Sequence, residues 1–285
     1  MNTAVDTRSL THSELEEALA SVRIPAYPAT VAEVMREAQK DEPQVKVLAR
    51  IISSDVGMSA LAVKLANSPM FGNGNPVKSV QQAVSRLGTK NILNVVIAVA
   101  LRNTTTGLPA DLMERFWART STLALATGVL ARRHIGISPD AAYTYALFHD
   151  AAIPVLMLNF PKYAEICGEA LHDPESLIPI EREHFNCDHA VVGWLLARSW
   201  GLPPLIASAI RYHHDPEVYI LPEKELPSDA LALIAVTVIT EHAIADLTGT
   251  AAPVDNKAFE DAKMFLGSSD ADIDEFREII AAALA

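Results

Sequence analysis

The chain has 285 residues and a mass of 30.8 kDa, and its 23 basic and 35 acidic side chains give a formal net charge of −12. This balance argues against a nucleic-acid-binding protein, because contacts to phosphates need a basic surface. Half of the residues are apolar, which is enough to bury a core in one large domain or in two packed lobes.

The acidity is concentrated at the C-terminal end. Residues 215–285 carry 15 acids and 4 bases, whereas residues 1–214 carry 20 acids and 19 bases. The plain interpretation is a solvated helical face, and the sharper one is an acidic surface for a basic partner protein.

Three features bear on the cellular location. Residues 1–10 lack a basic segment followed by an apolar one, so no export signal is expected. The two cysteines, Cys167 and Cys187, are too few for a disulfide framework. The most apolar stretches, 92–101 and 230–240, are shorter than the roughly 18 to 20 residues of a membrane span. We therefore predict a cytoplasmic protein that does not cross a membrane.

Helix signals occur along the whole chain, and strand signals are almost absent. Thr11 with Glu14 resembles a capping box at the start of a first helix. Gly88 follows an apolar helical pattern as a helix stop would, and Ser138 with Pro139 is a typical helix start. The sequence therefore predicts an all-α fold, and the break at 104–109 predicts an N-terminal helical lobe that ends near residue 105.

Histidines gather in the second half of the chain. Six of the nine lie between residues 149 and 214, and histidine is a common metal ligand and a general acid or base near neutral pH. The pair His149-Asp150 stands in an apolar helical context, where a carboxylate needs a cation, a metal or several donors to stay charged. A lone buried histidine is more often a hydrogen-bonded core residue, so the pair alone indicates little.

Read together, motifs in both halves resemble the HD-related output domain (HDOD) family, non-catalytic relatives of the HD phosphohydrolases. The resemblance covers about residues 24–215 and is carried by Pro25, Pro28, Asp55, Asn67, Gly72, Leu87, Gly88, His149, Asp150, Glu181, His189, Gly193, Trp200, Pro203, His213 and His214. It implies an N-terminal extension at 1–23, a helical lobe at 24–105, an HD-like helical core at 106–215 and acidic helices at 216–285 that complete the core.

The same resemblance supplies a comparison for the chemistry. Active HD enzymes bind a divalent metal through a histidine, the His-Asp pair and a later aspartate, and the metal activates water for phosphoester hydrolysis. Arg119 stands where the first histidine is expected, and a guanidinium cannot coordinate a cation. The last aspartate is replaced by Thr240 or Glu241, depending on the register.

Two alternatives remain for the other polar residues. The first is a structural network in which Arg119 forms an ion pair with Asp150, so that Arg119→Ala would cost about 3 kcal/mol or more of stability. The second is a partial cage for Fe, Mn or Zn. Its ligands would be His149, Asp150, His189, His213 and His214.

Two other sites are disfavoured. Cyclic dinucleotide phosphodiesterases of the HD superfamily have a Gly-Tyr-Pro motif after the paired histidines, whereas this chain continues with Asp215-Pro216. His184, Cys187 and His189 lack the spacing of a structural zinc motif, and Asp188 is better interpreted as a helix N-cap.

The sequence thus predicts a non-enzymatic regulatory module of bacterial signal transduction. It would act through an unidentified protein partner or small ligand, with no cofactor required. The alternative is a metal-dependent phosphohydrolase that acts on a nucleotide or another phosphoester.

Overall fold

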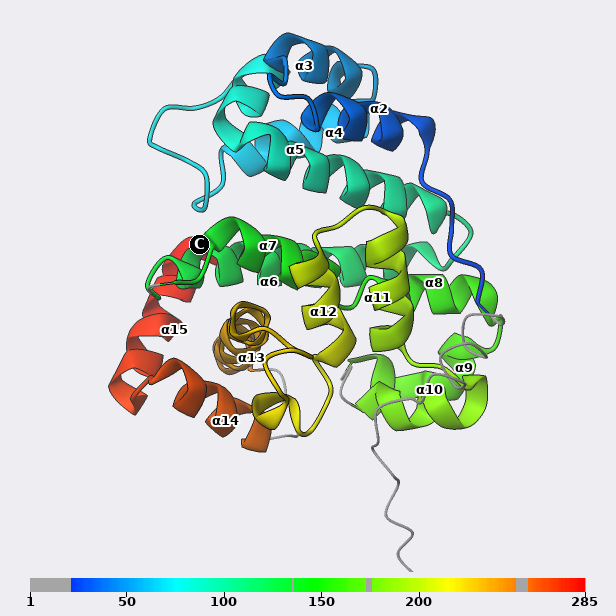
Figure 1. Ribbon diagram of the computed structural model, residues 1–285, viewed down its shortest axis with the longest axis vertical. Helices are drawn as coiled ribbons and strands as arrows, with labels where there is room; N and C mark the ends of the chain where they lie inside the picture. The colour runs from blue at the N-terminus through cyan, green and yellow to red at the C-terminus, as the bar shows by residue number, and fades with distance from the viewer. Residues whose placement is uncertain (1–21, 135, 173–175, 250–255, 285) are drawn as a thin grey trace, which may run out of the picture. The chain divides into compact units, whose positions relative to one another are not determined.

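The structure is a computed structural model that describes residues 22–134, 136–172, 176–249 and 256–284 (Figure 1). In these residues the secondary structure is helical and no β-strand is present, which confirms the predicted all-α fold. The predicted capping box of Thr11 and Glu14, and nearly all of the predicted extension at 1–23, lie outside the described residues.

The chain divides into two compact units. The smaller one is Ala26–Gly107, and the larger one combines Met1–Pro25 with Leu108–Ala285. The smaller unit therefore lies, in sequence, inside the larger one.

The smaller unit is a helical bundle around one long helix. Its helices are α2 (Ala29–Ala38), α3 (Val45–Ser53), α4 (Val56–Ala66) and α5 (Val80–Thr104), and α5 packs against each of the other three. Gly88 interrupts α5 with a φ of 73°, a left-handed conformation that glycine adopts without steric cost. The predicted helix stop at Gly88 is confirmed.

The larger unit contains the remaining helices. They are α6 (Ala110–Ala131), α7 (Pro139–Phe148), α8 (Ala152–Asn159), α9 (Tyr163–Cys167), η1 (Gly168–His172), α10 (Leu177–Phe185), α11 (His189–Ser199), α12 (Pro204–Tyr212), η3 (Val218–Ile220), α13 (Ser228–Thr248), α14 (Asn256–Leu266) and α15 (Asp270–Leu284).

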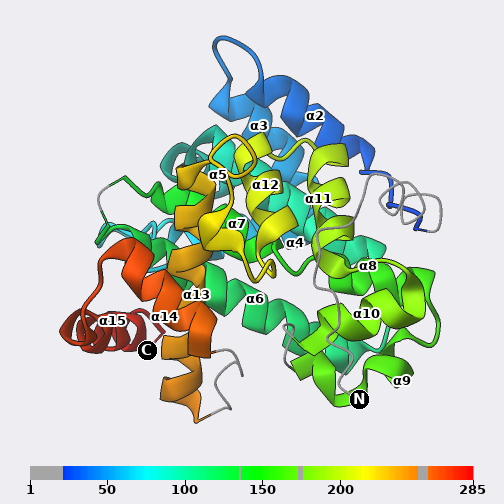
Figure 2. The same ribbon diagram turned by 60° about the horizontal axis from the view of Figure 1, so that its bottom comes forward.

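Helix α13 forms the centre of this unit. It contacts α6, α7 and α12 as well as the C-terminal helices α14 and α15, and it lies between α12 and those two helices (Figure 2). The predicted start of α7 is confirmed, because the Ser138 hydroxyl accepts a hydrogen bond from the Ala141 N–H and Pro139 is the first helical residue. The following helix α8 packs against α11.

Among the residues that the structure describes, three helical segments are long and apolar enough to cross a membrane by length and composition alone: Val80–Thr104, Pro139–Asn159 and Ser228–Thr248. The expectation that the apolar stretches are too short for a membrane span is therefore wrong, because the helices that contain them are longer than the stretches themselves. Most residues in the apolar window of each segment are buried inside the protein. Their apolar character is thus accounted for by core packing, and the location of the protein stays a prediction.

A short N-terminal segment is fastened to the larger unit by hydrogen bonds. The Trp200 Nε1–H donates to the Pro25 carbonyl oxygen at 2.7 Å. Asn159 accepts from the Arg23 N–H at 2.8 Å and donates to the Arg23 carbonyl oxygen at 3.2 Å. These contacts join the segment before the smaller unit to α8 and to the residue that follows α11.

We expect Trp200→Phe to lower the free energy of unfolding by about 1–3 kcal/mol, because it removes the donor to Pro25 and part of a side chain that is fully buried. Urea unfolding measures the loss. Trp194→Phe, in the helix α11 that Trp200 follows, is the control and should cost less than about 1 kcal/mol, because Trp194 is partly exposed. Equal losses in the two variants would contradict a special role of Trp200.

Candidate metal centre

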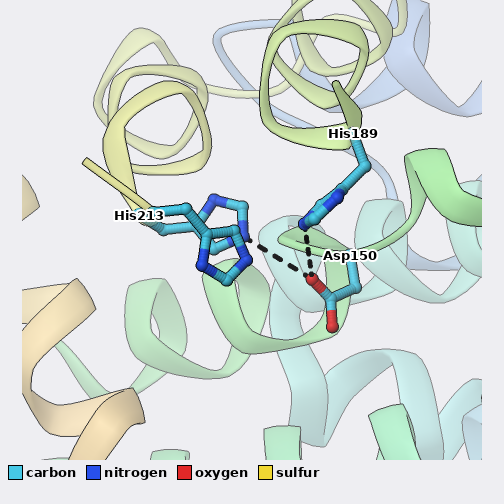
Figure 3. Close-up of side chains that lie close together, drawn as sticks. Asp150, His189 and His213 are labelled. Carbon is cyan, nitrogen blue, oxygen red and sulfur yellow. Dashed lines mark ion pairs between the residues drawn. The ribbon is translucent and has the colours of Figure 1, made fainter. Parts of the chain in front are cut away.

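Four polar side chains meet at the ends of helices in the larger unit. Asp150 lies in the turn between α7 and α8, His189 is the first residue of α11, and His213 and His214 follow the last residue of α12. One ligand atom from each of the four lies within 4.8 Å of all the others. Figure 3 shows His189 and His213 converging on one oxygen of the Asp150 carboxylate. The Nε2 atoms of these two rings are each 3.6 Å from Asp150 Oδ1.

The local sequence explains where α11 begins. The Asp188 carboxylate accepts a hydrogen bond from the Val191 N–H at 2.8 Å, which caps the helix and confirms the predicted N-cap. Arg182 Nε donates to the other oxygen of Asp188 at 2.8 Å, which compensates this fully buried charge. The cap therefore fixes His189 in the first turn of the helix.

Gly193 lets α11 approach its neighbours closely. A Cβ atom added at this position would lie 2.8 Å from Ile210 Cγ2 and 3.5 Å from the carbonyl oxygen of His149. Any larger residue would push α11 away from α12 and from the turn that carries Asp150. The glycine thus holds together the three segments that supply the four side chains.

The histidine rings are oriented by hydrogen bonds on their outer side. His213 Nδ1 is 2.7 Å from the Ile210 carbonyl oxygen. Because a carbonyl oxygen only accepts, Nδ1 carries the proton and the Nε2 of the neutral ring has a free lone pair. His189 Nδ1 lies 2.7 Å from a Glu181 oxygen, with the same consequence for its Nε2. Metal-binding histidines have such partners on the second ring nitrogen.

The inner atoms of the cluster lack hydrogen-bond partners. Asp150 Oδ1 and the Nε2 atoms of His189, His213 and His214 are all buried and unsatisfied. Buried polar atoms are almost always hydrogen-bonded, so four orphans in one place need a physical reason. A carboxylate oxygen and three imidazole nitrogens are ligands that Zn²⁺, Mn²⁺ and Fe²⁺ accept. The residues present therefore fit a divalent metal ion.

Burial and nearby charges shift the pKa values of the clustered histidines in two directions. Burial lowers the pKa of His213, and it lowers the pKa of His214 strongly, with the neighbouring imidazoles adding to the effect. Burial also opposes the charge of His189, but the Glu181 carboxylate outweighs it and raises the pKa of His189. His213 and His214 are thus held in the neutral form that can coordinate a metal.

His149 lies on the other side of the Asp150 carboxylate. Its Nε2 is 3.3 Å from Asp150 Oδ2 and 3.7 Å from Glu241 Oε1, and its Nδ1 is 2.9 Å from the Ala146 carbonyl oxygen. Burial lowers the pKa of His149, but the two carboxylates outweigh burial and raise it to about 10. This positive charge in turn contributes to an Asp150 pKa well below its usual range, against the effect of burial. Of the five predicted ligands, four thus form the cluster, and His149 contacts the other oxygen of Asp150.

The predicted ion pair between Arg119 and Asp150 is not formed. Arg119 reaches Glu241 instead, with 3.6 Å between Nη2 and Oε1, and its side chain is 45% exposed. Thr240 and Glu241 on α13 were the two alternatives for the last aspartate of HD enzymes. The Thr240 hydroxyl is buried and donates to the Val236 carbonyl oxygen of its own helix. Glu241 is the side chain that faces His149.

Glu181 contacts the cluster through His189, and the sequence did not single it out. It is fully buried on α10 and accepts hydrogen bonds from both the backbone N–H and the ring of His189, and also from the Tyr163 hydroxyl. In the sequence, Glu181 was only one member of the family pattern. No rule of sequence spacing predicts that a carboxylate contacts the ring of a histidine eight residues later. The available signal was a charged residue on the helix face that Leu177, Ile178 and Phe185 otherwise make apolar.

The disfavoured zinc site of His184, Cys187 and His189 is not assembled. His184 is exposed, whereas Cys187 is a buried free thiol. Within the part of the chain that the structure describes, the cluster around Asp150 is the one group of three or more potential metal ligands.

Comparisons with known proteins agree with this architecture. The family model of the HDOD domain matches residues 24–216, so the chain belongs to the HDOD family. An uncharacterized protein of Treponema pallidum (strain Nichols) is 27% identical over 209 residues, which are 69% of this chain and 39% of that protein. The chain thus spans about two fifths of the length of this relative.

Two solved structures show the same fold. A Shewanella amazonensis protein named as a candidate phosphohydrolase has a TM-score of 0.68 and 23% identity, with 96% of this chain and 95% of that chain covered. A Marinobacter aquaeolei protein named as a candidate signal transduction protein has a TM-score of 0.69 and 21% identity, with 98% and 66% covered. At these identities the similarity establishes the fold alone.

We expect Arg119→Ala to lower the free energy of unfolding by less than about 1 kcal/mol, because a half-exposed ion pair is screened by solvent. Arg115→Ala, which removes the exposed pair with Asp111 on the same helix, is the control and should behave alike. Chemical denaturation of both variants checks this. A loss of about 3 kcal/mol for Arg119→Ala would contradict this expectation and support the buried ion pair between Arg119 and Asp150.

Proposed function

We propose that this HDOD protein is a regulatory module of signal transduction that binds one divalent metal ion through Asp150, His189, His213 and His214, and that it does not hydrolyse phosphoesters. The observation that carries the proposal is the convergence of four buried ligand atoms without hydrogen-bond partners. Such an arrangement is costly unless a cation completes it.

The arrangement favours a structural or sensing ion over a catalytic one. A catalytic centre keeps a coordination position open for water or substrate, whereas structural sites are filled by protein ligands. Here the protein offers four ligands, and Asp150 and His189 are almost completely buried. When bound, the ion supplies a fixed positive charge and Lewis acidity at this point.

The other side of Asp150 supports the loss of hydrolysis. The resemblance to HD enzymes places a metal among the first histidine, the His-Asp pair and the last aspartate. In this chain two protein cations stand there: His149 faces Asp150 and Glu241, and Arg119 faces Glu241. Fixed cations next to these carboxylates oppose the binding of a metal at that position.

A regulatory role follows from the helices that the ligands join. Asp150 belongs to the α7–α8 turn, His189 to α11, and the His213-His214 pair to the end of α12. Metal binding would link these three segments and stabilise the folded state by mass action. A signalling protein that recognises this unit would therefore sense whether the ion is bound. We propose that the protein works in the bacterial cytoplasm, in keeping with its two buried free cysteines.

We expect purified protein to contain about one equivalent of Fe, Mn or Zn per chain, and we expect His213→Ala to lose it, because that variant removes one of four ligands. Elemental analysis by plasma mass spectrometry measures the content. His184→Ala, an exposed histidine outside the cluster, is the control and should keep the metal. Metal-free wild-type protein that also fails to take up any of these ions after dialysis would contradict the proposal.

The second candidate function is a metal-dependent phosphohydrolase, which is favoured by the presence of a metal-ligand cluster in an HD-like fold. We expect the metal-loaded protein to show no turnover of p-nitrophenyl phosphate, bis(p-nitrophenyl) phosphate or nucleoside triphosphates above that of His213→Ala. A spectrophotometric and phosphate-release assay checks this. Turnover that requires the metal and disappears in His213→Ala would replace the regulatory proposal by the enzymatic one.

A further inference from the structure

A buried carboxylate, that of Glu181, lies behind His189 and outside the four ligands. Glu181 is fully buried, and its two oxygens have separate tasks. Oε2 accepts from the His189 backbone N–H at 2.8 Å and lies 2.7 Å from His189 Nδ1, whereas Oε1 accepts from the Tyr163 hydroxyl. One oxygen thus holds both the backbone and the ring of the residue that starts α11.

We infer that Glu181 is a positioning residue for the metal centre: it fixes which nitrogen of His189 faces the ion and increases the donor strength of that nitrogen. The inference rests on the proposed metal site. It assigns to a residue on α10 a role that the four ligands alone do not supply.

The geometry gives the physical reason. An ionised carboxylate has no proton to donate, so the hydrogen atom on His189 Nδ1 points to Glu181 and the Nε2 lone pair points into the cluster. The negative charge behind the ring stabilises positive charge that moves onto the imidazole when Nε2 donates to a metal. Such carboxylate–histidine pairs typically change metal affinity about 10- to 100-fold.

Tyr163 holds Glu181 in turn. Its hydroxyl donates to Oε1, and both side chains are fully buried, so neither can exchange its partner for water. The contact links α9 to α10 and fixes the carboxylate against rotation. A chain of hydrogen bonds therefore runs from Tyr163 through Glu181 to the metal-facing ring of His189.

The substitution Glu181→Gln removes the charge of this side chain but keeps its shape. In Glu181→Gln the amide oxygen can still accept from the two His189 donors, and the amide N–H₂ can donate to the Tyr163 oxygen, so the shape and hydrogen bonds are retained while the charge is lost. Glu37→Gln is the matched control. Glu37 is also buried and accepts a hydrogen bond from a backbone N–H, that of Gln44 at 2.9 Å, but it belongs to the smaller unit and not to the unit that carries the cluster.

The experiment is a chelator-buffered titration of metal-free full-length protein with Zn²⁺, followed by intrinsic fluorescence, together with the visible absorption spectrum of the Co²⁺-loaded protein. We expect Glu181→Gln to raise the Kd for Zn²⁺ about tenfold or more and to shift the Co²⁺ bands. Glu37→Gln should change the Kd by less than about threefold, with an unchanged Co²⁺ spectrum.

Wild-type affinity and an unchanged Co²⁺ spectrum in Glu181→Gln would overturn the inference while leaving the metal site intact, and so would an equal loss in Glu37→Gln. Absence of Zn²⁺ binding by the wild-type protein would overturn the proposed function and this inference with it. If circular dichroism shows that Glu181→Gln is unfolded, Tyr163→Phe carries the test. It frees one oxygen of Glu181 and should raise the Kd about twofold or more, and no change would overturn the inference.

Discussion

The structure around the candidate metal centre depends on one buried carboxylate. Asp150 is 3% exposed, and a carboxylate in such a place is stable only with cations or hydrogen-bond donors around it. The larger unit meets this need with helix ends rather than with helix interiors. The first turn of α11 and the last turn of α12 bring their histidines to the turn between α7 and α8, and Gly193 permits the close approach.

The two oxygens of Asp150 face different environments. On the Oδ2 side a positively charged His149 and the pair of Glu241 with Arg119 provide protein cations where an HD enzyme would use a metal. On the Oδ1 side, Oδ1 itself and the Nε2 atoms of His189, His213 and His214 are buried without hydrogen-bond partners. The first side is occupied by protein cations, whereas the second offers ligand atoms. This asymmetry is the basis for proposing a metal on the Oδ1 side and no hydrolysis.

The sequence predicted the helical fold and most of the candidate site because the signals were local or belonged to an ordered family pattern. The helix stop at Gly88, the helix start at Ser138 and the cap at Asp188 follow from backbone chemistry that acts over a few residues. The partner of Arg119 could not be predicted in this way, because the choice between Asp150 and Glu241 depends on how α6 packs against α13. Glu181 was missed for a similar reason, since its role arises only when α10 folds back onto the start of α11.

Crystallographic anomalous scattering at the absorption edge of the bound metal tests the central claim most directly. We predict one peak for the ion, coordinated by Asp150 Oδ1 and the Nε2 atoms of His189, His213 and His214. A peak located instead between His149 and Glu241, or metal-free density with direct hydrogen bonds among the four side chains, would contradict the account.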